Sequence, residues 1–468
     1  MASGGPTRCS GAYQERGERD VDAPNVIVIQ SDDHGTLDAG CYGSTVLETP
    51  HLDALATRGT RFTQAYGHAV CCPSRAALLT GRYPQRGGVN DWCSNHPSDE
   101  RETSLDSDAV TLPSLLGSHG YATALVGKWH LGARLDRGPR TFGFDEFFGH
   151  RGGFIDNYSH TFLHANPGQP PFHDLWSDES EIDANGRYFP DMVTERAQGF
   201  LERQRGGPFY LHLAFNLPHY PYQPDEDLAE AYARLGDPRG PYAAMVTTLD
   251  RRVGRVLETV DELGLRESTL IVYASDHGHS TEDYRNWDEN YGAHGGGGDT
   301  GRWRGAKESF LEGGIRVSTI LSLPGRIPEG AVRDQVVTNM DVLPTILEVC
   351  GVLPPPAKPD GQSLWPILGD PTARTQYETL CFQWQQRWMA REGDWKLFHN
   401  GLDTTGKFSR HPEGQRQLET WHLACLAEDE PELRNHAADE PGIVAHLREV
   451  YGRWAADVFA RPASTRRA

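Results

Sequence analysis

The stretch NVIVIQSDDHG, residues 25–35, contains the pattern that decides the fold. Its first six residues form a nearly continuous apolar run, which is typical of a strand buried on both faces of a parallel sheet. The polar residues that follow, with Asp32 and Asp33 among them, would begin a loop at the carboxyl end of that strand. The sequence therefore predicts a sheet whose first strand ends in two carboxylates.

Three later segments repeat this pattern of an apolar run that leads into charged or imidazole side chains. The runs cover residues 121–126, 209–215 and 269–274. The side chains that follow them are Lys128, His130, His219, Asp276 and His277. Helices are expected between the strands, at about 50–58, 73–80, 111–119, 190–204 and 241–263. We therefore predict an α/β sandwich with a large, mostly parallel central sheet flanked by helices, in which ligands bind beyond the carboxyl ends of the strands.

The sequence changes character after Pro354-Pro355-Pro356. Short Trp-rich runs within 380–397 predict antiparallel strands, and a last helix is expected over about 441–459. We expect three regions, which are a disordered N-terminal segment over 1–23, a catalytic domain over 24–370 and a small antiparallel α+β C-terminal subdomain over 371–468.

Composition excludes several classes of protein. The formal charge of −20, from 45 basic and 65 acidic residues, disfavours a nucleic-acid binder. The eight cysteines are scattered without a CxxC repeat, which disfavours a disulfide scaffold or a structural zinc site. Neither an apolar signal-peptide segment nor a run of ~18 apolar residues occurs, so we expect no membrane partner. The expected location is cytoplasmic as the sequence is written, or periplasmic or secreted if a leader was removed.

The carboxylates at the strand ends indicate a cation site. Asp32, Asp33 and Asp276 would repel one another at one edge of a sheet unless a cation lay among them. Oxygen ligands of this kind favour calcium or magnesium. Either pair alone would equally suit the start of a loop, but their matched positions after two core strands favour the cation.

Cationic side chains indicate an anionic ligand. The candidates are Arg75, Lys128, His130, His219 and Lys307. A single histidine is more often structural and a single lysine more often solvated. Together at one pocket, such groups would hold an anionic, tetrahedral group through charge-assisted hydrogen bonds.

A nucleophile is expected where Cys71 and Cys72 precede Pro73, a residue that suits the first turn of a helix. The helix N-terminus favours an anionic nucleophile nearby. Cys71 lies four residues and Cys72 three residues from Arg75, and both spacings share a helical face. Spacing therefore does not choose between them, and two inert buried thiols are the alternative.

The stretch CCPSR at 71–75, followed by TGR at 80–82, resembles the C-x-P-S-R signature of the type I sulfatases and its downstream T-G-R. Other stretches resemble sulfatase motifs in the same order. These are Asp32-Asp33, GKWHLG at 127–132, Pro218-His219, SDHG at 275–278, Lys307 before EGGIRV at 312–317, and EPELRN at 430–435. The resemblance covers about residues 24–435. It implies an alkaline-phosphatase-like fold and an enzyme that hydrolyses a sulfuric ester.

The resemblance also implies the nature of the nucleophile. Cys71 would be oxidised to formylglycine by a formylglycine-generating enzyme during maturation, while Cys72 occupies the variable position. The aldehyde works as a hydrate, in which one hydroxyl attacks the sulfate sulfur and releases the alcohol. The other hydroxyl then loses its proton, and the adduct collapses and expels sulfate.

The remaining roles are assigned by motif position. Asp32, Asp33, Cys71, Asp276 and His277 would hold a divalent ion, calcium in preference to magnesium, although many relatives have Asn where this chain has His277. Arg75 and Lys128 would steady the hydrate, and His130 would take its proton. Lys128, His219 and Lys307 would bind sulfate, with His219 or Lys307 protonating the leaving oxygen.

The substrate is the least defined part of this prediction. Residues 144–158 are similar to a loop that borders the pocket of glycan and aryl sulfatases. Its candidates for a sugar subsite are His150, Asp156, Asn157 and Tyr158, and His160 just beyond the loop is a further candidate. An ordinary ordered loop is the alternative.

We expect a small sulfated substrate, a saccharide first and an aryl sulfate as well. The competing functions are a phosphonate monoester or phosphodiester hydrolase of the same superfamily and a non-catalytic binder of sulfated glycans.

Overall fold

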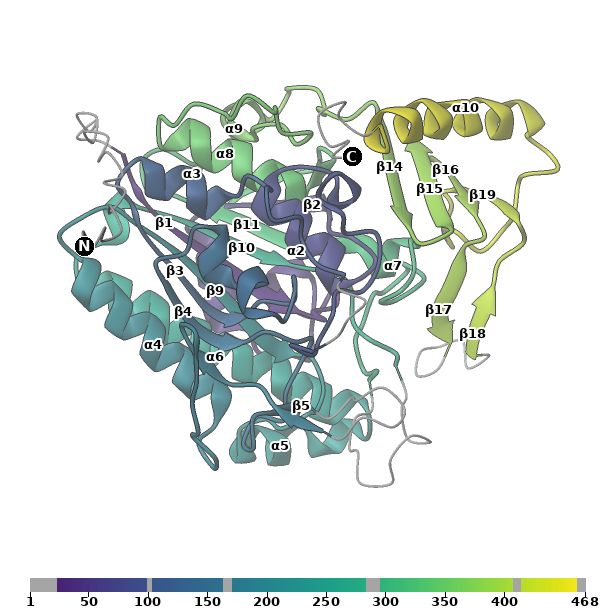
Figure 1. The fold of residues 1–468 in the computed structure, drawn as a ribbon. Coiled ribbons are helices and arrows are strands. Elements are labelled where there is room, and N and C mark those ends of the chain that lie inside the picture. The colour runs from purple at the N-terminus through teal and green to yellow at the C-terminus, as the bar shows by residue number, and fades with distance from the viewer. Residues whose placement is uncertain (1–22, 99–102, 163–170, 283–294, 407–413, 461–468) are drawn as a thin grey trace, which may run out of the picture.

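The computed structural model describes residues 23–98, 103–162, 171–282, 295–406 and 414–460 (Figure 1). The N-terminal segment predicted to be disordered therefore lies outside the described residues, apart from residue 23. Among the residues that are described, no helix combines the length and the apolar character needed to cross a membrane.

The large sheet is parallel at its centre, as predicted. Strand β1 (Asn25–Asp32) lies between β9 (Phe209–Pro218) and β10 (Thr269–Ser275) and runs parallel to both. Next to β9 the parallel part continues with β3 (Ala122–Lys128) and β4 (Glu146–His150). All of the apolar runs found in the sequence are strands of this sheet.

The remaining strands at its two sides were not identified in the sequence. On one side β11 (Arg316–Ser322) runs antiparallel to β10 and to β2 (Thr60–Tyr66), and β12 (Ala331–Arg333) and β13 (Val337–Thr338) pair with β2. On the other side β7 (Trp176–Ser177) and β8 (Ser180–Glu181) follow β4. These strands are short or only partly apolar, so their periodicity is weak.

Helices cover both faces of the sheet, which explains why every residue of β1 is buried (Figure 1). Val26 and Val28 face one core, and Ile27 and Ile29 face the other, because successive side chains of a strand point to opposite faces. The first core is closed by α2 (Cys71–Thr80), α3 (Leu112–Ser118), α8 (Val342–Val349) and α9 (Trp365–Gly369). The second is closed by α1 (Pro50–Thr57), α4 (Phe189–Gln204) and α6 (Arg239–Glu262). The five helices expected in this part of the sequence are confirmed.

The C-terminal part contains a second, antiparallel sheet, also as predicted. Its strands, in order, are β14 (Thr379–Trp384), β15 (Arg387–Glu392), β16 (Trp395–His399) and β19 (Trp421–Cys425). Helix α10 (Pro441–Val458) packs on it, with the Tyr451 ring stacked 3.8 Å from the ring of Trp388. A separate ribbon of β17 (Leu402–Gly406) and β18 (Gly414–Gln417) lies beside this sheet in Figure 1.

Four smaller elements complete the described secondary structure that matters for the site. Helix α5 (Glu226–Tyr232) packs on α6, and β5 (Thr161–Phe162) pairs with β6 (Phe172–His173). The short helix α7 (Glu312–Ile315) leads directly into β11 and is completely buried.

A buried ion cluster joins the two sheets. Lys396 of β16 binds Glu312 of α7 at 2.7 Å and Glu432 at 3.0 Å, and the side chains of all three are fully buried. Arg316 binds the second oxygen of Glu312 at 2.6 Å. Burial alone would raise the pKa of Glu312, but Lys396 and Arg316 hold that pKa well below its usual range. The C-terminal sheet is thus fixed to the main sheet by charges that have no access to water.

We expect Lys396→Met to lower the free energy of unfolding by about 3–5 kcal/mol, because two carboxylates would stay buried without their ammonium partner. Urea unfolding followed by tryptophan fluorescence measures this loss. Lys358→Met, at an exposed lysine, is the matched control. A loss no greater than that of the control would contradict a stabilising role for the cluster.

Candidate active site

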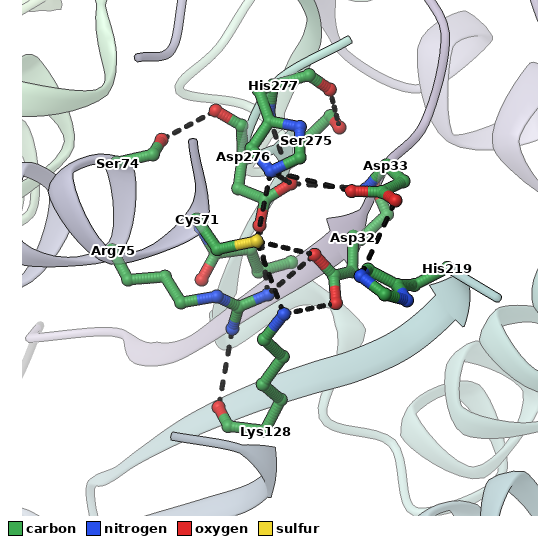
Figure 2. Close-up of polar contacts among 12 residues, drawn as sticks. Asp32, Asp33, Cys71, Ser74, Arg75, Lys128, His219, Ser275, Asp276 and His277 are labelled. Atoms are coloured by element: carbon green, nitrogen blue, oxygen red, sulfur yellow. Dashed lines mark hydrogen bonds and ion pairs between the residues drawn. The ribbon is translucent and has the colours of Figure 1, made fainter. Parts of the chain in front are cut away.

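Charged side chains converge where four parallel strands end, as predicted. Strand β1 ends at Asp32, β3 at Lys128 and β9 just before His219, and Asp276 follows β10. The N-terminus of α2 faces the same point and brings Cys71 there (Figure 2). Segments more than 200 residues apart in the chain therefore meet, since Cys71 contacts His277 at a sequence separation of 206.

Cys71 lies at the centre of this cluster. Its Sγ is 3.1 Å from Nε2 of His277, 3.3 Å from Nζ of Lys128 and 3.5 Å from Oδ1 of Asp32, as Figure 2 shows. The side chain has no exposed surface. Burial raises the pKa of the Cys71 thiol well above its usual value, although Lys128 opposes this shift. An unmodified Cys71 is therefore held as a neutral thiol rather than as a nucleophilic thiolate.

The structure separates the two adjacent cysteines that spacing left equivalent. Cys72 lies in the apolar core between the sheet and α2, and its Sγ accepts a hydrogen bond from the backbone N–H of Cys93 at 3.1 Å. Only Cys71 points into the charged cluster.

Ser74 and Arg75 fasten α2 to the end of β10. The Ser74 hydroxyl donates to the carbonyl of Asp276 at 2.6 Å, and Nδ2 of Asn339 donates to the Ser74 hydroxyl at 2.9 Å. Arg75 binds Oδ2 of Asp276 at 3.1 Å and the carbonyl of Lys128 at 3.3 Å. No sequence motif pointed to Asn339, which comes from the segment before α8. These contacts set the position of the Cys71 side chain one turn earlier.

Four side chains offer ligand atoms to one cation. Each side chain contributes one ligand atom, and these four atoms all lie within 4.8 Å of one another. The residues are Asp32, Cys71, Asp276 and His277. Nδ1 of His277 lies 2.9 Å from the carbonyl of Gly278, to which it can only donate, so the lone pair of Nε2 points into the cluster. This arrangement is usual for a metal-binding histidine.

Asp33 extends this donor set. Its Oδ1 lies 3.5 Å from Nε2 of His277, and its backbone N–H donates to Oδ1 of Asp276 at 3.3 Å. Burial raises the pKa of Asp276 to about 7 and raises that of Asp33 well above its usual value. A divalent cation would favour the charged form of both carboxylates. Asp32, Cys71, Asp276 and His277 therefore fit such an ion, and Asp33, the fifth predicted ligand, borders them.

Basic groups line the other side of Cys71. Lys128 binds Oδ2 of Asp32 at 2.6 Å, and Lys307 lies 3.3 Å from Oδ1 of Asp33 and 3.1 Å from Nε2 of His219. Burial alone would raise the pKa of Asp32, but Lys128 in particular holds it well below its usual range. Burial, followed by the charge of Lys307, lowers the pKa of His219 well below its usual value.

His130 is buried, yet neither of its ring nitrogens has a hydrogen-bond partner. Its ring stacks on that of Trp92, with centroids 6.1 Å apart and an angle of 23° between the planes. Burial lowers the pKa of His130 well below its usual value, and the charge of Lys128 lowers it further. The imidazole is therefore neutral and can accept a proton. The backbone of His130 has φ of 56° and that of Asp33 φ of 63°, in the left-handed region, which Asp and His enter more often than most residues do.

The predicted substrate loop divides into two parts. His150 ends β4 beside Lys128, is completely buried, and leaves Nε2 without a hydrogen-bond partner. Asp156 instead accepts hydrogen bonds from the backbone N–H groups of Tyr158 and Ser159 at 3.0 and 2.7 Å. Oδ1 of Asn157 accepts a bond from Asn216 at 2.9 Å. The structure therefore places His150 beside Lys128 in the strand register, with its ring 5.4 Å from that of Phe189, whereas the polar contacts of Asp156 and Asn157 hold the loop together.

Comparison with known proteins agrees with this geometry. The sulfatase family model matches residues 24–352, and the model described as N-sulphoglucosamine sulphohydrolase, C-terminal, matches residues 302–449. N-acetylgalactosamine-6-sulfatase of Canis lupus familiaris is 32% identical over 413 residues, which cover 81% of this chain and 74% of that protein. Steryl-sulfatase of Mus musculus is 31% identical over 451 residues, which cover 80% of this chain and 70% of the relative.

Solved structures show the same fold. The complex of Ps i-CgsB with k-i-k-neocarrahexaose superposes with a TM-score of 0.78 at 25% identity and covers 94% of each chain. The phosphonate monoester hydrolase of Agrobacterium radiobacter has a TM-score of 0.62 at 21% identity and covers 93% of this chain and 95% of its own. On the family match and the curated relatives together, this chain belongs to the sulfatase family of the alkaline phosphatase superfamily and is a sulfuric ester hydrolase.

Proposed function

We propose that this enzyme hydrolyses the sulfate ester of a small saccharide, with formylglycine made from Cys71 as the nucleophile and a calcium ion at the carboxylate cluster. The observation that supports this most is the position of the Cys71 side chain. It lies between the carboxylates and His277 of the cation site on one side and the basic groups on the other, so an oxygen nucleophile there would face both the metal and a sulfate ester.

The formylglycine and the calcium ion would each supply one kind of chemistry. The hydrated aldehyde would supply one hydroxyl to attack sulfur and a second hydroxyl to release sulfate. The calcium ion would lower the energy of negative charge on the oxygens near it.

The basic residues then act around residue 71. Arg75 and Lys128 orient the group at this position and offset negative charge there. His130, neutral and without a hydrogen-bond partner, accepts the proton of the second hydroxyl. Lys128, His219 and Lys307 bind sulfate oxygens, and the pair of His219 and Lys307 protonates the leaving oxygen.

Two of the relatives support a saccharide substrate. One is named for N-acetylgalactosamine-6-sulfate chemistry, and a solved neighbour holds a carrageenan-type hexaose. His150 lies at the edge of the basic cluster with an unpartnered nitrogen and is our first candidate for a contact to the sugar. Asp156 and Asn157 would act at the same subsite by shaping its loop.

A substrate panel tests the proposed function. We expect the aldehyde-containing enzyme to hydrolyse sulfated mono- and disaccharides and 4-nitrophenyl sulfate faster than a phosphonate monoester or a phosphodiester of the same leaving group. Initial rates at equal enzyme concentration give the comparison. Faster turnover of the phosphorus esters would refute the sulfatase assignment of this site, and binding of sulfated glycans without any turnover would support the non-catalytic alternative.

The two cysteines provide a matched pair of variants. We expect Cys71→Ala to abolish hydrolysis, because the nucleophile and one cation ligand are lost together. Cys72→Ala should keep most of the activity, because Cys72 contacts only the core and the Cys93 backbone. Initial rates on 4-nitrophenyl sulfate measure the activity of both variants, and their melting temperatures show whether each variant is folded. Equal loss of activity in both would show that the choice of Cys71 is wrong.

Removal of the metal should lower both activity and thermal stability. An ion that binds only the folded state stabilises it by about 2.7 kcal/mol at a free concentration roughly 100 times its dissociation constant. We therefore expect the melting temperature to fall after dialysis against a chelator and to recover with added calcium. Asp276→Asn should melt at the same temperature with and without calcium. The predicted cation site would be contradicted if metal analysis showed that chelation had removed the ion while the melting temperature of the wild type stayed the same.

A further inference from the structure

Glu282 is a carboxylate next to the site that the sequence motifs did not single out. One of its oxygens, Oε2, lies 2.8 Å from Nζ of Lys307, 2.9 Å from the hydroxyl of Ser280 and 3.1 Å from the hydroxyl of Tyr220. The side chain is only 9% exposed. Three donors thus converge on one nearly buried oxygen, which fixes the carboxylate and gives Lys307 a short charge-assisted bond.

The other contacts of Lys307 define how its ammonium is oriented. An ammonium group has three N–H donors. Three acceptors surround it, which are Oε2 of Glu282 at 2.8 Å, Nε2 of His219 at 3.1 Å and Oδ1 of Asp33 at 3.3 Å. The bonds to Glu282 and His219 hold the ammonium in place, and the N–H that faces Asp33 would become available for the leaving oxygen when Asp33 joins the cation site as predicted.

The tautomer of His219 follows from its other nitrogen. Nδ1 of His219 lies 2.6 Å from the backbone carbonyl of Tyr220, and a carbonyl oxygen can only accept. Nδ1 therefore carries the hydrogen, and the lone pair of Nε2 accepts the N–H of Lys307. A row of three groups results, in which the carboxylate of Glu282 contacts the ammonium of Lys307 and this ammonium contacts the imidazole of His219.

The backbone around Glu282 and Lys307 is fixed by the same strand. The hydroxyl of Thr281 donates to the carbonyl of Thr404 in β17 at 3.0 Å, and the backbone N–H of Ala306 donates to the Thr404 hydroxyl at 2.9 Å. The backbone N–H of Lys307 also donates to the carbonyl of His279 at 2.9 Å. One residue of the C-terminal part thus holds both loops that present the pair.

A second cation is the competing explanation for this cluster, because donor atoms of Asp33, His219 and Glu282 lie within 4.8 Å of one another. The ammonium of Lys307 already contacts all three side chains. The positive charge that these acceptors require is therefore supplied by the protein itself.

We propose that Glu282 is a positioning residue that holds Lys307 against His219 so that this pair delivers a proton to the leaving oxygen of the substrate. The inference rests on the proposed function of the site. In the step concerned, the oxygen nucleophile at residue 71 would form a bond to sulfur and lose its proton, while the bond between sulfur and the ester oxygen breaks with its electron pair on that oxygen. A proton of the Lys307–His219 pair moves to the ester oxygen, so the product leaves as a neutral alcohol, and the proton lost by the nucleophile returns to the pair through solvent.

This role depends on the leaving group in a way that a purely structural role does not. A sugar alkoxide is a strong base and needs the proton, whereas 4-nitrophenoxide is stable without it. The contribution of Glu282 should therefore be large for a sugar sulfate and small for 4-nitrophenyl sulfate.

The test compares kcat/KM of Glu282→Gln and Glu282→Ala with the wild type on both substrates. We expect losses of at least about 10-fold on a monosaccharide sulfate, part of the roughly 10²–10⁴-fold that a positioned general acid contributes, and the larger loss for alanine. On 4-nitrophenyl sulfate the losses should be clearly smaller, because the contact of Lys307 with sulfate is weakened while proton donation is not needed. Tyr220→Phe, which removes one donor to Oε2 and leaves the Lys307 contact, should show a smaller change in the same direction. Glu181→Gln, at a half-exposed carboxylate that binds His173 on the surface, is the matched control and should change neither rate.

The outcomes separate this inference from the proposed function. Equal losses on the two substrates in a folded variant, or no loss on either, would refute the positioning role. The second cation would be supported instead if Glu282→Gln lacked one metal equivalent and excess divalent ion restored both of its rates. That result would overturn the positioning role. A wild type that hydrolyses neither sulfate would instead refute the proposed function, because the comparison between variants would then have no activity to act on.

Discussion

The arrangement of this site depends on one constraint, which is that buried charges need partners. Asp32, Asp33 and Asp276 lie out of contact with water, as do Arg75, Lys128 and Lys307. An isolated charge in such a place costs several kcal/mol, and only opposite charge and hydrogen bonds offset this. Each carboxylate here lies within 3.6 Å of a basic group. The position of one side chain therefore determines those of its neighbours, and the site exists only as a complete set.

The sheet supplies the place where this set can form. Parallel strands end at the same edge, so four short loops deliver their polar side chains to one point. Two layers of helices keep water from both faces of the strands. The C-terminal part contributes as well, through Lys396 of its sheet in the buried ion cluster and through Thr404 of the separate β17–β18 ribbon at the loops beside the site. It is thus part of the structure that holds the active-site loops, although few of the motif residues come from it.

The sequence was sufficient for the parts of the fold with strong local patterns. The apolar strands, the long helices and the family motifs led to the correct architecture and to a set of side chains that the structure brings together. It was insufficient for β2 and β11, whose partly polar faces pack against distant segments. It also gave no basis for Asn339 or Glu282, because their contacts join residues up to 265 positions apart, as between Asn339 and Ser74. Asp156 shows the reverse case, since its residue type suited a ligand contact while its hydrogen bonds serve a turn.

The complete burial of the Cys71 side chain sets a limit on timing. Under the proposed function, an enzyme that oxidises Cys71 would have to act before β1, β10 and α2 come together, because another protein cannot reach a side chain that has no exposed surface. Folding and oxidation would then compete, and a chain that folds first would keep its thiol. The fraction of active molecules in a preparation would reflect the relative rates of these two processes in the producing cell, and fully folded protein would gain nothing from later exposure to the oxidising enzyme.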